Sequence, residues 1–177
     1  MTSHYEYQKN LKALWEFALE RYQKGDRNPQ GYFDRSQRDF MDDMGLRAMD
    51  IYDYVEDFST YSEPDFETFL MICEARRDYF MVIQQQQPSA KQVDSASLPP
   101  KEADVDGIVW LPRLLAKARA KLRGELADDV MYGCGGDRKF FRDSNIHPGE
   151  FLRHVWASRD SDAKVIGWVK ARRSGLA

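Results

Sequence analysis

The feature that most constrains the fold is an internal match between residues 100 positions apart. The identical pairs are Tyr32 and Tyr132, Arg38 and Arg138, Phe40 and Phe140, Asp43 and Asp143, and Val55 and Val155. Gly45 is matched by Asn145, and these two residue types best tolerate the left-handed backbone that ends many helices. The match therefore predicts two diverged copies of one small unit.

Apolar residues recur at helical spacing in four segments of each half. We expect helices over residues 5–24, 35–44, 48–58 and from 64 into the glutamine run at 84–87, and then over 111–123, 137–144, 148–158 and 161–173. Asp137 and Ser161 are the expected N-caps of two of these helices. The predicted fold is all-α, with two similar four-helix units packed into one compact body.

The stretch between the units, residues 88–110, is rich in Gln, Ser, Pro, Lys and Asp. Few large apolar residues occur in it, and such a composition is typical of a connector. We therefore divide the chain into a first repeat at 1–87, a connector at 88–110 and a second repeat at 111–177.

Composition favours a soluble protein, since 31% of the residues are charged and no apolar run reaches the roughly 20 residues of a membrane span. The start of the chain lacks a signal-peptide pattern, so a cytoplasmic location and no membrane partner are expected. Two cysteines do not make a disulfide framework. The first 90 residues hold 10 Lys and Arg against 17 Asp and Glu, and the rest hold 16 against 12, so we expect the halves to attract each other.

Several motifs of the second half resemble those of a bacterial family of uncharacterised proteins, domain of unknown function 5069. They are LPRLLAKARAKLRGEL at 111–126, YGCGGDRKFF at 132–141, FLRHVW at 151–156 and the closing WVKARR. The first half looks like a diverged copy that keeps EPDFETFL and RRDYF but has no counterpart of Cys134, Gly135 or Gly136. The resemblance implies a fold unit and no particular activity.

The richest polar cluster surrounds the two glycines of the second half. It consists of Tyr132, Cys134, Gly135, Gly136, Asp137 and Arg138. Free N–H groups in the first turn of a helix can bind a phosphate or carboxylate, and Arg138 would add a bidentate donor. The alternative is a tight turn that Asp137 caps.

Cys134 is also a candidate nucleophile, with His147 or His154 as its base. A buried, unreactive thiol is the more common state of a cysteine. A zinc site built from Cys134, His147 and His154 fits no familiar ligand spacing. We therefore expect no catalytic residue, no metal and no cofactor.

The predicted helix at 111–123 separates an apolar stripe from a basic face made by Arg113, Lys117 and Lys121. Such a face can bind nucleic acid, but the pI of about 5.7 and the lack of interleaved aromatic residues do not favour it. We expect a solvated face that the acidic first half partly neutralises. Adjacent acids, such as Glu56 with Asp57 and Asp128 with Asp129, are expected to be solvated as well.

Each copy places an acid twelve residues after its arginine, which predicts the ion pairs Arg38–Asp50 and Arg138–Glu150. Aromatic residues at helical spacing, among them Trp15, Phe69 and Phe151, are predicted to form the core.

Together these patterns favour a non-enzymatic helical interaction module or small-anion-binding module, whose partner is an unknown protein or a small anionic ligand. The candidate ligand-binding residues are Arg113, Lys117, Tyr132, Cys134, Gly135, Gly136, Asp137 and Arg138. The alternatives are an enzyme that uses the Cys134 loop and a nucleic-acid binder that uses the basic helix at 111–123.

Overall fold

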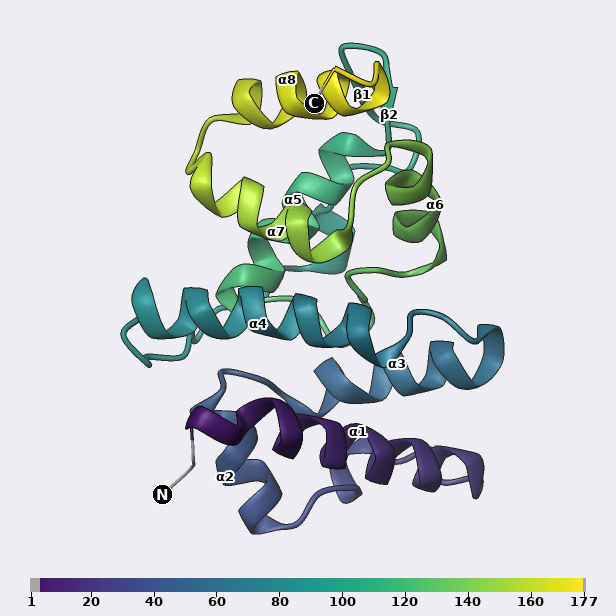
Figure 1. The fold of residues 1–177 in the computed structure, drawn as a ribbon, viewed down its shortest axis with the longest axis vertical. Helices are drawn as coiled ribbons and strands as arrows, with labels where there is room; N and C mark the ends of the chain where they lie inside the picture. The colour runs from purple at the N-terminus through teal and green to yellow at the C-terminus, as the bar shows by residue number, and fades with distance from the viewer. Residues whose placement is uncertain (1–3, 177) are drawn as a thin grey trace.

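The computed structural model describes residues 4–176, which form an all-α fold with one very short sheet. Figure 1 shows α4 lying across the middle of the molecule, with α1–α3 on one side of it and α5–α8 on the other. The helices are α1 (Tyr7–Gln23), α2 (Arg35–Asp43), α3 (Ala48–Tyr61), α4 (Phe66–Val82), α5 (Leu111–Arg123), α6 (Gly135–Asp143), α7 (Pro148–Ala157) and α8 (Asp162–Arg173). The predicted fold class is confirmed.

Local capping sets where these helices begin and end. Asp34 and Gln37 form a capping box at the start of α2, and His147 accepts the N–H of Gly149 at the start of α7. The turns that follow α2 and α6 use left-handed residues at the matched positions, Gly45 at φ 68° and Asn145 at φ 51°.

The connector is more ordered than its composition suggested. It contains a 3-10 turn, Ser95–Ser97, and a hairpin of β1 (Asp104–Val105) and β2 (Ile108–Val109), which pair antiparallel. Leu98 and Ile108 are buried in the main core. Short 3-10 turns also precede α1, at His4–Glu6, and α2, at Pro29–Gly31.

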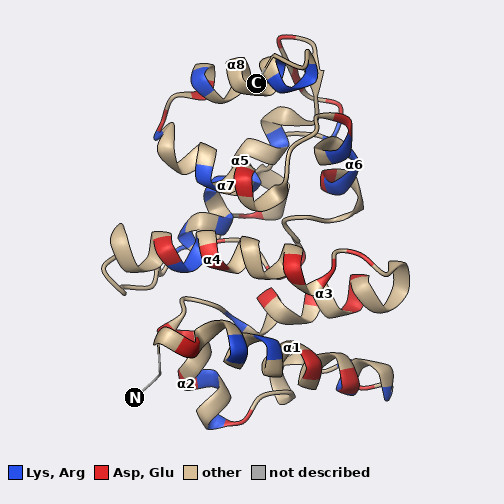
Figure 2. Cartoon of the chain, in the orientation of Figure 1, with Lys and Arg blue, Asp and Glu red and all other residues tan. Residues whose placement is uncertain are grey.

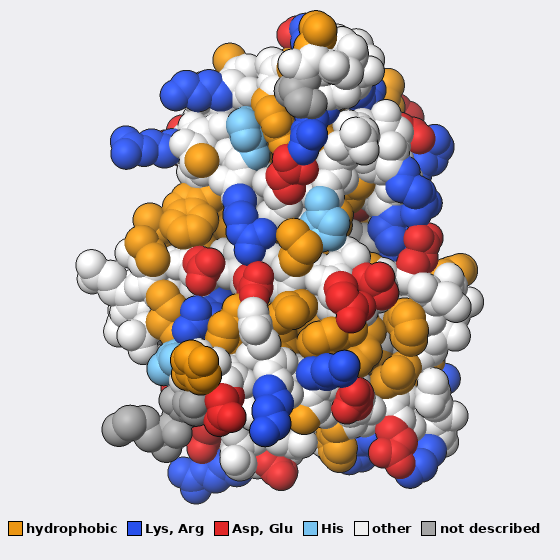
Figure 3. Space-filling view, in the orientation of Figure 1, with side chains coloured by type: hydrophobic (Ala, Val, Ile, Leu, Met, Phe, Trp, Pro, Cys, Tyr) orange, Lys and Arg blue, Asp and Glu red, His pale blue; other side chains and the backbone are white. Residues whose placement is uncertain are grey.

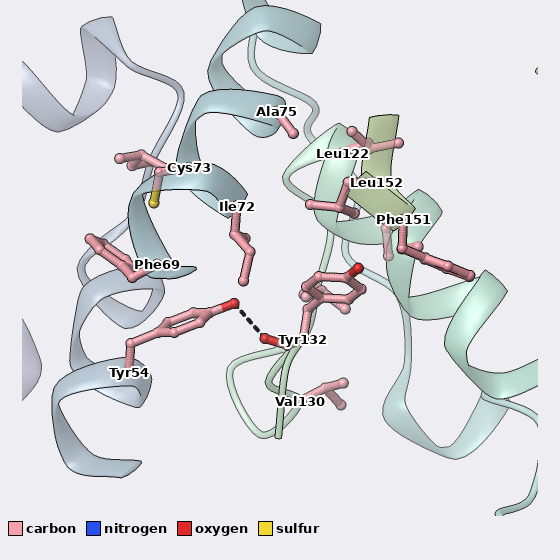
Figure 4. Packing of buried hydrophobic residues seen from close by; sticks show 14 of the residues in the cluster. Tyr54, Phe69, Ile72, Cys73, Ala75, Leu122, Val130, Tyr132, Phe151 and Leu152 are labelled. Atoms are coloured by element: carbon pink, nitrogen blue, oxygen red, sulfur yellow. Dashed lines mark hydrogen bonds between the residues drawn. The ribbon is translucent and has the colours of Figure 1, made fainter. Parts of the chain in front are cut away.

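The core runs through both halves. Helix α4 packs against α7 and α5 of the second half and against α1 of the first half. The predicted aromatic residues contribute to it: Trp15, Phe69 and Phe151 are all buried. Figure 4 shows how the halves meet, with Ile72 of α4 lying near Tyr132 and the Tyr54 hydroxyl donating to the carbonyl oxygen of Tyr132.

Charge is distributed unevenly along the chain, and both signs occur on the face drawn in Figure 3. Figure 2 shows acidic residues along α3 and basic residues on α6. On the face drawn in Figure 3, basic and acidic side chains are interspersed among hydrophobic ones. Within residues 4–176, no helix is both long and apolar enough to cross a membrane.

Candidate functional site

Four of the eight candidate residues lie together at a cleft between the two halves. This cleft, which we call the interface cleft, has a volume of about 500 Å³. Arg113, Lys117, Cys134 and Gly136 line it from the second half, whereas α3 lines it from the first. Tyr132, Asp137 and Arg138 are buried nearby and have structural contacts, described below.

The sequence predicted Asp137 as the N-cap of α6, and this prediction is wrong. The N-cap is Cys134, without a side-chain cap bond, and Asp137 lies within the first turn. Its fully buried carboxylate accepts hydrogen bonds from Trp110 Nε1 at 2.9 Å, from the Gly133 N–H at 2.8 Å and from Lys117 Nζ. The Asp137 carboxylate therefore holds the loop before α6 through buried hydrogen bonds. No side chain caps the first amide N–H groups of α6.

Lys117 and Lys121 are buried, so the predicted solvated basic face of α5 is wrong at both positions. Lys117 pairs with Asp137 and also donates to Cys134 Sγ at 3.4 Å. Lys121 Nζ lies 2.6 Å from Asp50 Oδ1. The expected neutralisation by the first half therefore occurs only at Lys121, inside the protein instead of at its surface, whereas Lys117 is neutralised by Asp137 of its own half.

Arg138 does not form the predicted pair with Glu150. Its Nη1 lies 2.6 Å from Asp57 Oδ2 and 2.8 Å from the carbonyl oxygen of Gly133, and its Nε lies 3.2 Å from Glu63 Oε1. Glu150 pairs with Arg172 instead. Arg138 is therefore a connection between the halves, since Asp57 and Glu63 belong to the first half.

The other predicted pair, Arg38 with Asp50, is also wrong. Arg38 Nε donates to the carbonyl oxygen of Phe33 at 2.8 Å. Asp50 accepts from Lys121 and from the N–H of Arg47. Burial opposes the ionisation of Asp50, but Lys121 and Arg47 outweigh it and hold its pKa below the usual value.

Tyr132 is fully buried and cannot contact a ligand in the cleft. Its hydroxyl donates to the carbonyl oxygen of Pro148 at 2.8 Å, and its own carbonyl accepts from Tyr54. These bonds hold the loop before α6 between α3 and α7.

The two histidines considered as partners of Cys134 are engaged elsewhere. His147 caps α7, and the ring of His154 stacks on Trp168 with centroids 4.0 Å apart. Burial lowers the pKa of both. Within residues 4–176, no three His, Cys, Asp or Glu side chains converge as metal ligands.

Sequence reasoning missed the acidic wall of the interface cleft. Asp53, Glu56 and Asp57 lie on one face of α3, because they are three and four residues apart, and Asp128 and Asp129 join them from the loop after α5. Within the described chain, Asp53 has no hydrogen-bond or ion-pair partner. Burial and then the charges of Asp50, Glu56 and Asp57 raise the pKa of Asp53 to about 7, against an opposing effect of Lys121.

Trp110 was missed as well. It ends the connector in a left-handed conformation at φ 77°, and its ring lies over Gly136. A Cβ at Gly136 would lie 2.4 Å from Trp110 Cζ2, so only glycine permits this approach. The tryptophan ring thereby forms part of the cleft wall beside the start of α6.

No curated protein matches the chain. No solved structure matches it either. The family resemblance noted in the motifs is supported for the second half, and the first half lies outside the matched residues. The chain thus carries, over residues 98–175, a match to the family described as Domain of unknown function (DUF5069).

Proposed function

We propose that the chain is a non-enzymatic module that binds a small ligand in the interface cleft. The observation that carries this proposal is the pairing of two unlike walls across one cleft. The uncapped start of α6 and Arg113 form one wall, and the acidic face of α3 forms the other.

The α6 wall suits an anionic group. The first amides of a helix point toward its N-terminal side and carry a partial positive charge. Arg113 is half-buried and donates through Nη1 to the carbonyl oxygen of Pro99 at 2.8 Å, which fixes its guanidinium at the cleft. The buried ammonium of Lys117 adds positive charge behind this wall, although Asp137 offsets much of it.

The α3 wall suits a cationic group. Asp53 is the carboxylate of this wall that lacks a partner, whereas Asp57 is paired with Arg138 and Glu56 accepts from Tyr22. A ligand amine beside Asp53 would restore the ionised carboxylate, whose pKa burial has raised. We therefore propose a small bipolar ligand, with its anionic group at α6 and its cationic group at Asp53.

Thermal unfolding with four small probes tests this assignment. Glycine betaine and lysine carry both charges, acetate carries only the negative one, and methylamine only the positive one. We expect a bipolar probe to raise the Tm at concentrations where the single-charge probes do not. Asp53→Asn and Arg113→Met should each remove that advantage, whereas Asp78→Asn, which changes a half-buried acid outside the cleft lining, should keep it. Equal effects of all probes, or effects that survive both cleft variants, would contradict the proposal.

The second candidate is an enzyme that uses Cys134, favoured by the 3.4 Å contact between Lys117 Nζ and Cys134 Sγ. An ammonium beside a sulfur and a helix N-terminus both stabilise a thiolate. The rate of alkylation by iodoacetamide in the native protein decides between the candidates. A rate above that of a model thiol, lost in Lys117→Met, would favour the enzyme over the binding module.

We also propose that the chain arose by duplication, with repeats at 1–87 and 111–177 joined by a connector. In support, α2 and α6 have bounds exactly 100 residues apart, and α3 and α7 begin 100 residues apart. Several hydrogen bonds recur at matched positions: Arg38 and Arg138 donate to the carbonyl oxygens of residues 33 and 133, and the N–H groups of residues 46 and 146 donate to those of 41 and 141.

An experimentally determined structure tests the duplication directly. Superposition of residues 30–60 on residues 130–160 should bring Phe40 onto Phe140 within each unit. Phenylalanines in non-equivalent places, or units with different connections, would overturn it.

A further inference from the structure

Arg76 of α4 is a buried arginine without a carboxylate partner among the described residues. Its side chain is 3% exposed. Nη1 donates to Gln84 Oε1 at 2.7 Å and to the carbonyl oxygen of Leu122 at 3.0 Å. Nε is buried without an acceptor, and Nη2 has no hydrogen bond within residues 4–176. Three of the five N–H donors of this guanidinium are therefore unused.

The carboxylate that acts most on Arg76 is already committed elsewhere. Asp50 is paired with Lys121 at 2.6 Å and accepts the N–H of Arg47. The second half differs, because Glu150, the acid matched with Asp50, pairs with Arg172. Buried Arg76, Lys121 and Asp50 thus leave one positive charge uncompensated, apart from the partial charge of the carbonyls that end α5. In line with this, burial lowers the pKa of Arg76 to about 10.

Arg76 lines a cleft of about 450 Å³, which we call the Arg76 pocket, between the turn after α2 and the end of α5. Arg47 lines it too, but its Nε faces Asp50, with Oδ2 at 3.6 Å. Gly124, at φ 71°, forms the wall beside Arg76, where a Cβ would lie 2.6 Å from Nη2. Asp42 and Asp43 are exposed at the rim of the pocket. Their carboxylates therefore repel an anion at the entrance of the pocket and not beside the guanidinium.

We propose that the Arg76 pocket binds a small phosphate-type oxyanion, whose oxygens accept hydrogen bonds from the unused N–H groups of Arg76. A tetrahedral oxyanion matches the fork of a guanidinium and brings the missing negative charge. This site is separate from the interface cleft and does not depend on the function proposed for it. The anion is either free phosphate or the terminal phosphate of a small metabolite.

Calorimetric and thermal titrations of the full chain with inorganic phosphate and with glycerol 3-phosphate, at ionic strength held constant with chloride, test the site. We expect one equivalent to bind, with a Tm that rises with the logarithm of concentration. Tighter binding of glycerol 3-phosphate would identify a phosphomonoester, and tighter binding of phosphate a free anion. Arg76→Met should weaken binding at least tenfold, whereas Arg27→Met, which removes an exposed arginine, should leave it unchanged.

If Arg76→Met does not fold, the arginine side-chain NMR signals of the wild-type chain give the answer. The Arg76 Nε resonance should shift to saturation with the same midpoint as the calorimetric titration. The proposal is overturned if neither anion binds saturably, if binding survives in Arg76→Met, or if the Arg76 resonance does not respond.

Discussion

Lys121 and Asp50 form a buried ion pair across the two halves, with Nζ 2.6 Å from Oδ1 and side chains only 3% and 9% exposed. Asp50 also accepts the N–H of Arg47 at 2.8 Å and so closes the start of α3. The pair therefore ties α5 of the second half to the first turn of α3.

Loss of one partner of this pair should be far more costly than loss of both charges. We expect Lys121→Met to lower the free energy of unfolding by about 3–5 kcal/mol, because Asp50 is left buried and charged. Asp50→Asn in addition should recover most of that loss, since asparagine keeps the capping oxygen. Urea denaturation of the two single variants and the double variant measures the coupling; additive effects would show that the pair contributes nothing of its own.

We expect Arg138 to stabilise the fold through its ion pair with Asp57 and not through Glu150. Arg138→Met removes a pair with N–O distance 2.6 Å and a bond to Gly133, so we expect a loss of about 2–4 kcal/mol. The matched control is Arg142→Met, whose exposed pair with Glu63 should contribute less than about 1 kcal/mol. Double-mutant cycles should show coupling of Arg138 with Asp57 and none with Glu150.

Asp53 should make stability depend on pH in a defined direction. Its pKa is about 7 in the folded chain and near 3.9 when unfolded, so the folded state holds the extra proton between these values. Its contribution to stability is greatest below about pH 4, declines as pH rises to 7, and then levels off. Asp53→Asn should therefore be more stable than the wild type above pH 7, by at most about 4 kcal/mol, with the difference vanishing near pH 4. Chemical denaturation at pH 4, 6 and 8 checks the sign.

Gly136 should tolerate no side chain. Gly136→Ala places a methyl group against the Trp110 ring, and overpacking of this kind costs about 1–3 kcal/mol. Gly167→Ala on α8, where nothing lies within 4 Å of the added methyl, should instead gain up to about 1 kcal/mol from helix propensity. Thermal unfolding of both variants provides the comparison; equal effects would mean that Trp110 does not rest on Gly136.

The helices could be predicted because their signals are local. The apolar stripe of α5 and the turn residues Gly45 and Asn145 lie within a few positions of the structure that they determine. Asp137 was misplaced by three residues because the glycines before it enter the helix, so the N-cap is Cys134. The hairpin at 104–109 was missed because two-residue strands give no periodic signal.

The partners of charged residues could not be predicted in the same way. Lys121 looks like a surface residue from its own helix, and its burial depends on Asp50, which lies 71 positions earlier. Likewise Arg138 meets Asp57 across 81 positions. Asp53 belongs to the candidate site because α3 lines the same cleft as residues of α5 and α6. The spacing of residues within α3 does not predict this arrangement.

The position of α4 between the two halves has a consequence for the matched family. Residues 98–175 contribute Lys121, Arg138 and the face of α7 to contacts whose other side is residues 50–82. The first half therefore covers two cations and one face of α7 that belong to the matched residues. In a protein made of the second half alone, Lys121 and Arg138 would lose these carboxylate partners and the face of α7 would lose its contact with α4.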